Sequence, residues 1–252
     1  MKHIVSYSGG LGSFMAAYLT IQEYGTSDVV LIFTDTRTED EDLYRFLNES
    51  AEYLQLPVEV ISDGRDIWEV FEDVSYMGNS RVDPCSRILK REPARKWMKE
   101  HYSEKEAILY LGIGWDEMHR MDAISKNWQP YSVKAPLVDT PIHRDAIFDV
   151  LRQANIKPPK LYALGFLHNN CGGFCIKTGQ AQFLRLLKTM PDRYAIHEDR
   201  QEKLFRKIGQ HGFISVTRQG KTDYLSLKDF RCFVKDGATI DMFDIGGCGC
   251  FA

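Results

Sequence analysis

The first half of the chain alternates short hydrophobic runs with amphipathic stretches. Apolar, strand-like runs cover residues 2–7, 29–34, 58–61 and 107–112. Apolar residues at helical spacing begin at Phe14 and return over 39–54, 67–73, 84–101 and 115–127. This alternation predicts a doubly wound α/β fold, with a mainly parallel sheet covered by helices on both faces. Ligands of such folds bind at the carboxyl ends of the strands.

The pattern changes after about residue 156. Two consecutive prolines follow at 158–159, and helical spacing then covers 178–190 and 192–209. Two short strand-like runs around Arg218-Gln-Gly-Lys221 predict a hairpin. We therefore expect an α/β domain over residues 1–156 and an α-rich, cysteine-bearing extension over residues 157–252.

Composition narrows the functional classes. A net charge of −3 argues against a protein that coats nucleic acid, and 44% hydrophobic residues suffice for a substantial core. No apolar run approaches the roughly 20 residues of a membrane span, so we expect no membrane association and a cytoplasmic location. Six cysteines in a reducing compartment favour metal, cluster or redox chemistry over disulfides.

A glycine-rich segment, Ser8-Gly9-Gly10-Leu11-Gly12-Ser13, joins the first strand to the first helix. Such a turn leaves backbone N–H groups uncovered and aims the positive end of the helix dipole at one point. The segment is therefore a candidate phosphate cradle, although a plain connection between strand and helix has the same composition.

Acidic and glycine residues follow two other strands. Asp35 ends the second strand and could bind a ribose hydroxyl or an adenine amino group, or form an Asx turn or helix cap. Gly112 follows the fourth strand and permits close approach of a ligand. Asp116, Glu117 and Arg120 then lie at the start of the next helix, where an intrahelical ion pair is the simpler interpretation.

Cys85 lies at the predicted start of a helix, directly after Pro84. The helix dipole stabilises a thiolate at that position, which suits a ligand or a nucleophile; a buried, inert cysteine is the alternative. Arg87 and Lys90 lie one turn further on, where they could meet a phosphate or a sulfate.

Several segments in order resemble the phosphoadenosine-phosphosulfate reductase branch of the PP-loop ATP pyrophosphatase and adenine-nucleotide α-hydrolase superfamily. They are Ser8-Gly-Gly-Leu-Gly-Ser13, Cys85-Ser-Arg-Ile-Leu-Lys90, Gly112-Ile-Gly-Trp-Asp-Glu-Met-His-Arg120, Pro136-Leu-Val-Asp139, Pro159-Lys-Leu-Tyr-Ala-Leu-Gly-Phe166 and Cys171-Gly-Gly-Phe-Cys175. The chain departs from the family pattern at three places. Gly12 replaces an aspartate, Gly114 replaces an arginine, and Cys85 stands where the family has two cysteines.

The resemblance implies a bound adenine nucleotide. Its phosphates would lie on the cradle, and its adenosine would lie near Asp35 and Gly112. The assigned nucleotide-binding residues are Ser8, Gly9, Gly10, Gly12, Ser13, Asp35, Gly112, Asp116, Glu117 and Arg120. Lys90 would stabilise charge that develops on the phosphates, together with Mg²⁺.

Two glycine-flanked thiol pairs, Cys171 with Cys175 and Cys248 with Cys250, suit tetrahedral Zn²⁺ or an Fe–S cluster. By the resemblance, Cys85, Cys171, Cys175 and one tail cysteine, assigned as Cys248, would hold a [4Fe–4S] cluster, with zinc as the alternative. Cys250 occupies a place comparable to the catalytic tail cysteine of assimilatory reductases. The remaining cysteine, Cys232, is expected in the core.

Three functions remain open at this point. The first is an ATP pyrophosphatase that adenylates an acceptor and takes part in sulfur transfer with an Fe–S cluster. Candidate acceptors are tRNA, DNA and a small molecule, and a sulfur-donating protein is a candidate partner. The second is a sulfonucleotide reductase that uses a C-terminal thiol. The third is a zinc-stapled nucleotide or nucleic-acid binding module without catalysis.

Overall fold

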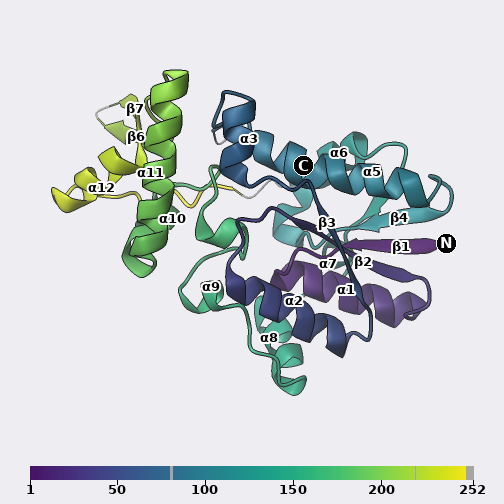
Figure 1. Ribbon diagram of the computed structural model, residues 1–252. Helices are drawn as coiled ribbons and strands as arrows, with labels where there is room; N and C mark the ends of the chain where they lie inside the picture. Colours follow the sequence, from purple (N-terminus) through teal and green to yellow (C-terminus); the bar gives the residue numbers. More distant parts are fainter. Residues whose placement is uncertain (80–81, 219, 248–252) are drawn as a thin grey trace.

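The computed structural model describes residues 1–79, 82–218 and 220–247 (Figure 1). Its centre is a five-stranded sheet in which every neighbouring pair is parallel. The strand order is β3 (Val58–Ser62), β2 (Val29–Asp35), β1 (Lys2–Ser6), β4 (Ala107–Tyr110) and β5 (Ser132–Lys134). The doubly wound α/β prediction is confirmed. The order reverses between β1 and β4, which leaves a crevice at their carboxyl ends where ligands of this architecture bind.

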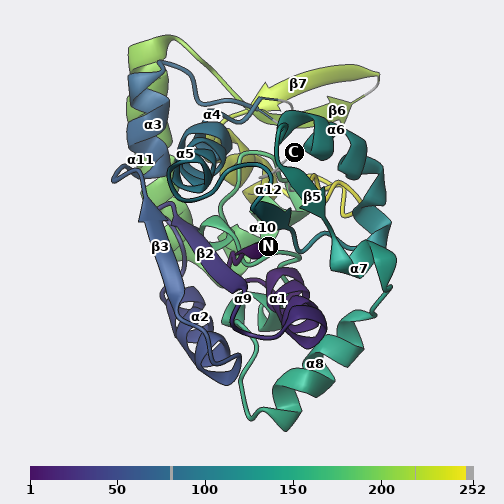
Figure 2. The same cartoon turned by 90° about the vertical axis from the view of Figure 1, so that its right-hand side faces the viewer.

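Side chains of successive strand residues alternate between two hydrophobic cores, one on each face of the sheet. Val5 of β1 packs with α1 (Leu11–Tyr24), α2 (Glu41–Tyr53) and α8 (Arg144–Gln153). The preceding residue, Ile4, packs on the other face. That face is covered by α5 (Glu92–His101) and α6 (Met121–Asn127), so helices cover both faces (Figure 2).

The C-terminal region forms a third core at one end of the sheet. Its elements are α10 (Gln180–Thr189), α11 (Pro191–Ile208), the hairpin β6 (Ile214–Arg218) and β7 (Lys221–Leu225), and α12 (Leu227–Lys235). They share this core with α3 (Ile67–Asp73), which Figure 1 shows beside them. The predicted hairpin is confirmed.

The core position predicted for Cys232 is wrong. Cys232 lies on α12 and is exposed, whereas Leu227 and Phe230 of the same helix are buried. An amphipathic helix presents one face to the core and the other to solvent, and Cys232 is on the solvent face.

The helix predicted over 84–101 forms in three consecutive pieces. They are α4 (Pro84–Ser86), a π-helical segment (Arg87–Arg91) and α5. The wide turn is closed by the Glu92 N–H, which donates to the carbonyl of Arg87. Pro93 explains it, because a proline in a regular helix would clash with the carbonyl of Leu89, four residues earlier. The π-helical segment carries Lys90, and such segments are frequent at functional sites.

Short helical pieces complete the fold. A 3₁₀ segment (Trp115–Arg120) leads into α6, so the helix predicted over 115–127 has two parts. The others are α7 (Pro136–Asp139), α9 (Lys160–Ala163) and a 3₁₀ turn (Cys171–Gly173). Within the ranges that the structure describes, no helix has both the length and the apolar character needed to cross a membrane.

Candidate functional site

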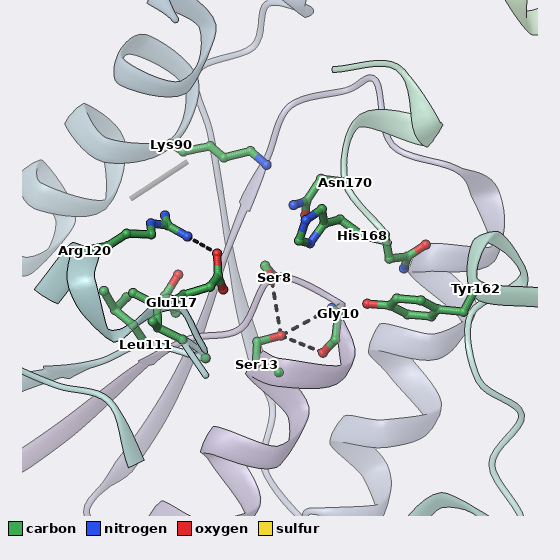
Figure 3. A pocket seen from close by; sticks show the side chains of 15 residues that line it. Ser8, Gly10, Ser13, Lys90, Leu111, Glu117, Arg120, Tyr162, His168 and Asn170 are labelled. Atoms are coloured by element: carbon green, nitrogen blue, oxygen red, sulfur yellow. Dashed lines mark hydrogen bonds and ion pairs between the residues drawn. The ribbon is translucent and has the colours of Figure 1, made fainter. Parts of the chain in front are cut away.

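A cavity of about 130 Å³ opens between the carboxyl ends of β1 and β4 (Figure 3). Eight of the predicted site residues line it: Ser8, Gly10, Gly12, Ser13, Lys90, Gly112, Glu117 and Arg120. The sequence interpretation missed the others, which are Ser6, Leu111, Ile113, Tyr162, His168, Asn169 and Asn170. The cavity therefore lies at the switch point of the strand order, where the fold places ligands.

The glycine-rich loop forms one wall of the cavity and begins α1. Gly9 has a φ of +74°, a backbone conformation that side-chain-bearing residues rarely adopt. Ser13 ties the loop together: its hydroxyl donates to the carbonyl of Gly10 at 2.9 Å and accepts from the N–H of Gly10 at 3.3 Å and from the Ser8 hydroxyl at 3.2 Å. Because its one proton is used on Gly10, Ser13 shapes the cradle and keeps the first turn of α1 directed at the cavity.

Gly12 and Gly112 hold the two strand-to-helix junctions in direct backbone contact. A Cβ added to Gly12 would lie 2.5 Å from the carbonyl oxygen of Gly112, and one added to Gly112 would lie 2.4 Å from the N–H nitrogen of Ser13. The family's aspartate at position 12 could not occupy this backbone without a shift. The close backbone contact therefore requires a residue without a side chain at both positions.

Two cationic side chains reach the cavity, and each has an acidic partner. Lys90 is buried, and its Nζ lies 3.6 Å from Oε1 of Glu39. Arg120 forms an ion pair with Glu117, one turn earlier in the 3₁₀ segment. Figure 3 shows Lys90 and Arg120 on one side of the cavity, facing Tyr162 and His168 on the other.

The opposite wall comes from the segment after α8, far along the chain from the cradle. The Tyr162 hydroxyl accepts a hydrogen bond from the N–H of Leu11 at 3.2 Å, and the Asn169 side chain donates to the carbonyl of Gly9 at 2.8 Å. The guanidinium carbon of Arg144 lies 4.7 Å from the centre of the Tyr162 ring. The Tyr162 hydroxyl therefore takes up one N–H group of the first turn of α1.

His168 extends from this wall into the cavity (Figure 3). Desolvation lowers its pKa; the nearby Glu117 opposes this, and Arg144 and Arg120 reinforce it. The imidazole is thus neutral at pH 7, so that it can accept a proton.

Three of the predicted nucleotide-binding residues lie outside the lining. Gly9 supports the loop from behind, with Leu43 packed where a Cβ would project. Oδ1 of Asp35 accepts the Arg37 N–H and the Tyr44 hydroxyl, both at 2.8 Å, which is the local-turn alternative for that residue. Asp116 is exposed on the outer side of the 3₁₀ segment. Contacts of Asp35 and Asp116 with a nucleotide stay predictions.

Cys85, Cys171 and Cys175 line one small cavity of about 20 Å³, together with Lys90 and Asp83. Oδ2 of Asp83 is buried there without a hydrogen bond. Within residues 1–79, 82–218 and 220–247, no three His, Cys, Asp or Glu side chains are arranged to hold a metal ion. The other two assigned cysteines, Cys248 and Cys250, lie outside the described residues.

The sequence profile of the phosphoadenosine phosphosulfate reductase domain matches residues 2–211. The chain is 26% identical over 110 residues to the uncharacterized protein MJ0066 of Methanocaldococcus jannaschii, covering 44% of this chain and 22% of that protein. It is also 26% identical over 147 residues to the uncharacterized nin region protein ORF290 of Escherichia phage lambda, and this match covers 48% of this chain and 51% of that protein. The chain thus spans about a fifth and about half of the lengths of these two relatives.

Two solved structures are similar at low identity. Phosphoadenylyl-sulfate reductase from Candida auris, in a phosphate complex, gives a TM-score of 0.44 at 15% identity and covers 66% of this chain and 77% of its own. NH₃-dependent NAD synthetase from Campylobacter jejuni, in complex with nitrate, gives a TM-score of 0.40 at 11% identity. The match covers 82% of this chain and 83% of the synthetase chain. Because the domain profile covers most of the sequence, the chain belongs to the phosphoadenosine phosphosulfate reductase domain family, as its motifs predicted.

Proposed function

We propose that the protein cleaves ATP between its α- and β-phosphates and transfers the adenylyl group to an acceptor. Membership of the family supports an enzyme that uses an adenine nucleotide. The observation that carries the proposal is the cavity itself, where the cradle, the start of α1 and the Lys90 ammonium converge at the switch point of the sheet.

Several of the lining groups would have a role in this reaction. The first-turn N–H groups of α1 would bind phosphate oxygens, and Lys90 would stabilise the charge that develops on the departing pyrophosphate. Glu117 would offer Mg²⁺ a carboxylate oxygen, the kind of ligand that this ion prefers, and a bound ion would neutralise charge on the phosphates. Neutral His168, which lines the same cavity, would accept the proton of an attacking acceptor.

We further propose that the acceptor chemistry is sulfur transfer, with Cys85, Cys171, Cys175 and Cys248 as ligands of a [4Fe–4S] cluster or, alternatively, of Zn²⁺. The shared cavity of the first three cysteines, next to Lys90, supports this. The described residues are not in a metal-holding arrangement. The acceptor, whether tRNA, DNA or a small molecule, and a sulfur-donating partner belong to the same proposal.

A sulfonucleotide reductase that uses the Cys250 thiol is the second candidate, and the family's name favours it. In that case the same cavity would bind adenylyl sulfate or its 3′-phosphorylated form.

Product analysis separates these candidates. Anaerobically purified protein is incubated with Mg²⁺ and α-labelled ATP, and in parallel with adenylyl sulfate or its 3′-phosphorylated form and a dithiol. With water as the acceptor in this assay, we expect AMP and pyrophosphate from ATP. Sulfite from a sulfonucleotide would support the reductase, and ADP as the main product from ATP would contradict the adenylyl-transfer mechanism. Lys90→Met should abolish turnover, whereas Lys96→Met, on the exposed side of α5, should not.

A further inference from the structure

Glu39 is a buried carboxylate that no part of the proposed chemistry uses. It lies between the end of β2 and the start of α2 and is 8% exposed. Its Oε1 accepts the Thr36 hydroxyl at 3.0 Å and lies 3.6 Å from Nζ of Lys90. Its Oε2 accepts the backbone N–H of Cys171. A buried charge is stable only when it is paired and hydrogen-bonded, and these contacts supply both.

Two partners of Glu39 connect the two cavities. Lys90 lines both the phosphate cavity, which opens between β1 and β4, and the cysteine cavity, which Cys85, Cys171 and Cys175 line. Cys171 lines the cysteine cavity. The Glu39 carboxylate therefore contacts the Lys90 ammonium, which would bind phosphate, and also the backbone N–H of Cys171, which begins the loop from Cys171 to Cys175.

The backbone of Cys171 has an unfavourable conformation. Its φ is +51°, a value that few residues other than glycine adopt. The neighbouring acid supports the same loop from the other side: Asp40 pairs with Arg193, and Arg193 packs against Gly172. A charge-assisted hydrogen bond from Cys171 to Glu39 is thus one of the contacts that hold a strained backbone in place.

We propose that Glu39 is a positioning residue that couples phosphate binding to the cysteine loop; this rests on the proposed binding of nucleotide phosphates. At 3.6 Å the ion pair is longer than a direct hydrogen bond, so the Lys90 ammonium can turn toward an anion in the cavity. The buried Glu39 carboxylate then depends more on its hydrogen bonds from Thr36 and Cys171, and the bond from the Cys171 N–H becomes stronger. Coupling of this kind is reciprocal, so a firmly held loop also favours anion binding.

Amide hydrogen exchange of the peptide covering 168–175 tests the coupling, with inorganic pyrophosphate as the probe. In the wild type, saturating pyrophosphate should slow exchange of this peptide at least threefold more than exchange of a peptide from α12. In Glu39→Gln that extra protection should disappear. Pyrophosphate should bind the variant more tightly, because the Glu39 charge no longer competes for Lys90. Glu41→Gln, an exposed acid two residues away, is the matched control and should behave as the wild type.

The outcomes are separable. If the wild type fails to bind pyrophosphate, the proposed function fails. If it binds but the 168–175 peptide gains no extra protection, or if Glu39→Gln retains that protection, the coupling is refuted. Should Glu39→Gln not fold, Glu39→Asp keeps the charge on a side chain too short to reach both Lys90 and Cys171. The 168–175 peptide of Glu39→Asp should likewise lose the extra protection, and a variant that retains this protection would refute the proposal.

Discussion

Alanine at Gly112 tests whether close packing of the two junctions creates the phosphate site. The new Cβ would lie 2.4 Å from the main-chain atoms of Gly12 and Ser13, where ordinary contacts begin at 3.4 Å. The obstruction is the backbone of the first turn of α1, so the segment that follows β4 and the start of α1 must separate by about 1 Å. Overpacking of this kind costs about 1–3 kcal/mol. For a chain of this size that corresponds to a fall in Tm of very roughly 2–12 °C.

The functional loss should exceed the loss of stability. A shift of about 1 Å at the start of α1 misdirects the N–H groups that would bind phosphate, and we expect ATP affinity to fall at least tenfold. Gly114→Ala is the matched control two residues away, because its Cβ would meet the end of the exposed Asp116 side chain, which can rotate. Urea unfolding and calorimetric titration with ATP measure both effects. Equal stability and equal ATP affinity in Gly112→Ala and Gly114→Ala would refute the reasoning.

Three further outcomes follow from single contacts. Tyr162→Phe removes the hydroxyl that accepts the N–H of Leu11. Pyrophosphate should then bind more tightly, by about 0.5–1.5 kcal/mol in a calorimetric titration, which is the value of one hydrogen bond. Weaker binding would mean that the hydroxyl itself contacts the ligand. Cys232→Ala should change the free energy of unfolding by less than about 0.5 kcal/mol, because the side chain is exposed. Burial, reinforced by Arg193 and Arg200, lowers the pKa of His197 from 6.5 to about 3. Its contribution to stability is therefore complete above pH 6.5 and is lost toward pH 3, at up to about 1.4 kcal/mol per pH unit. Urea midpoints at pH 7 and pH 5 should show a smaller fall for His197→Gln than for the wild type, and parallel falls would contradict this.

The sequence predicted those parts of the fold and the site that depend on local patterns. The cradle over 8–13 and the junction at Gly112 were identifiable because glycines directly follow apolar strands. Strand β5 was missed because it has three residues, of which Val133 is the apolar one. Helix α8 was missed although Ile147 and Leu151 face the core at helical spacing.

Long-range contacts explain the remaining misses. Tyr162 lies within a segment that resembled the family, but nothing local indicates that its hydroxyl meets the N–H of Leu11, 151 residues earlier. Asn169 reaches Gly9 across a similar separation. The role of Glu39 likewise appears when the β2–α2 loop, the π-helical segment and the Cys171 loop are placed together.

A crystal structure of the protein with Mg²⁺ and a non-hydrolysable ATP analogue tests the central claim most directly. We predict that the phosphates lie between β1 and β4, within hydrogen-bonding distance of the first-turn N–H groups of α1 and of Nζ of Lys90. Tyr162 should no longer accept from Leu11, and Lys90 should have moved away from Glu39. Phosphates bound elsewhere, with the contacts of Lys90 and Tyr162 unchanged, would contradict the account.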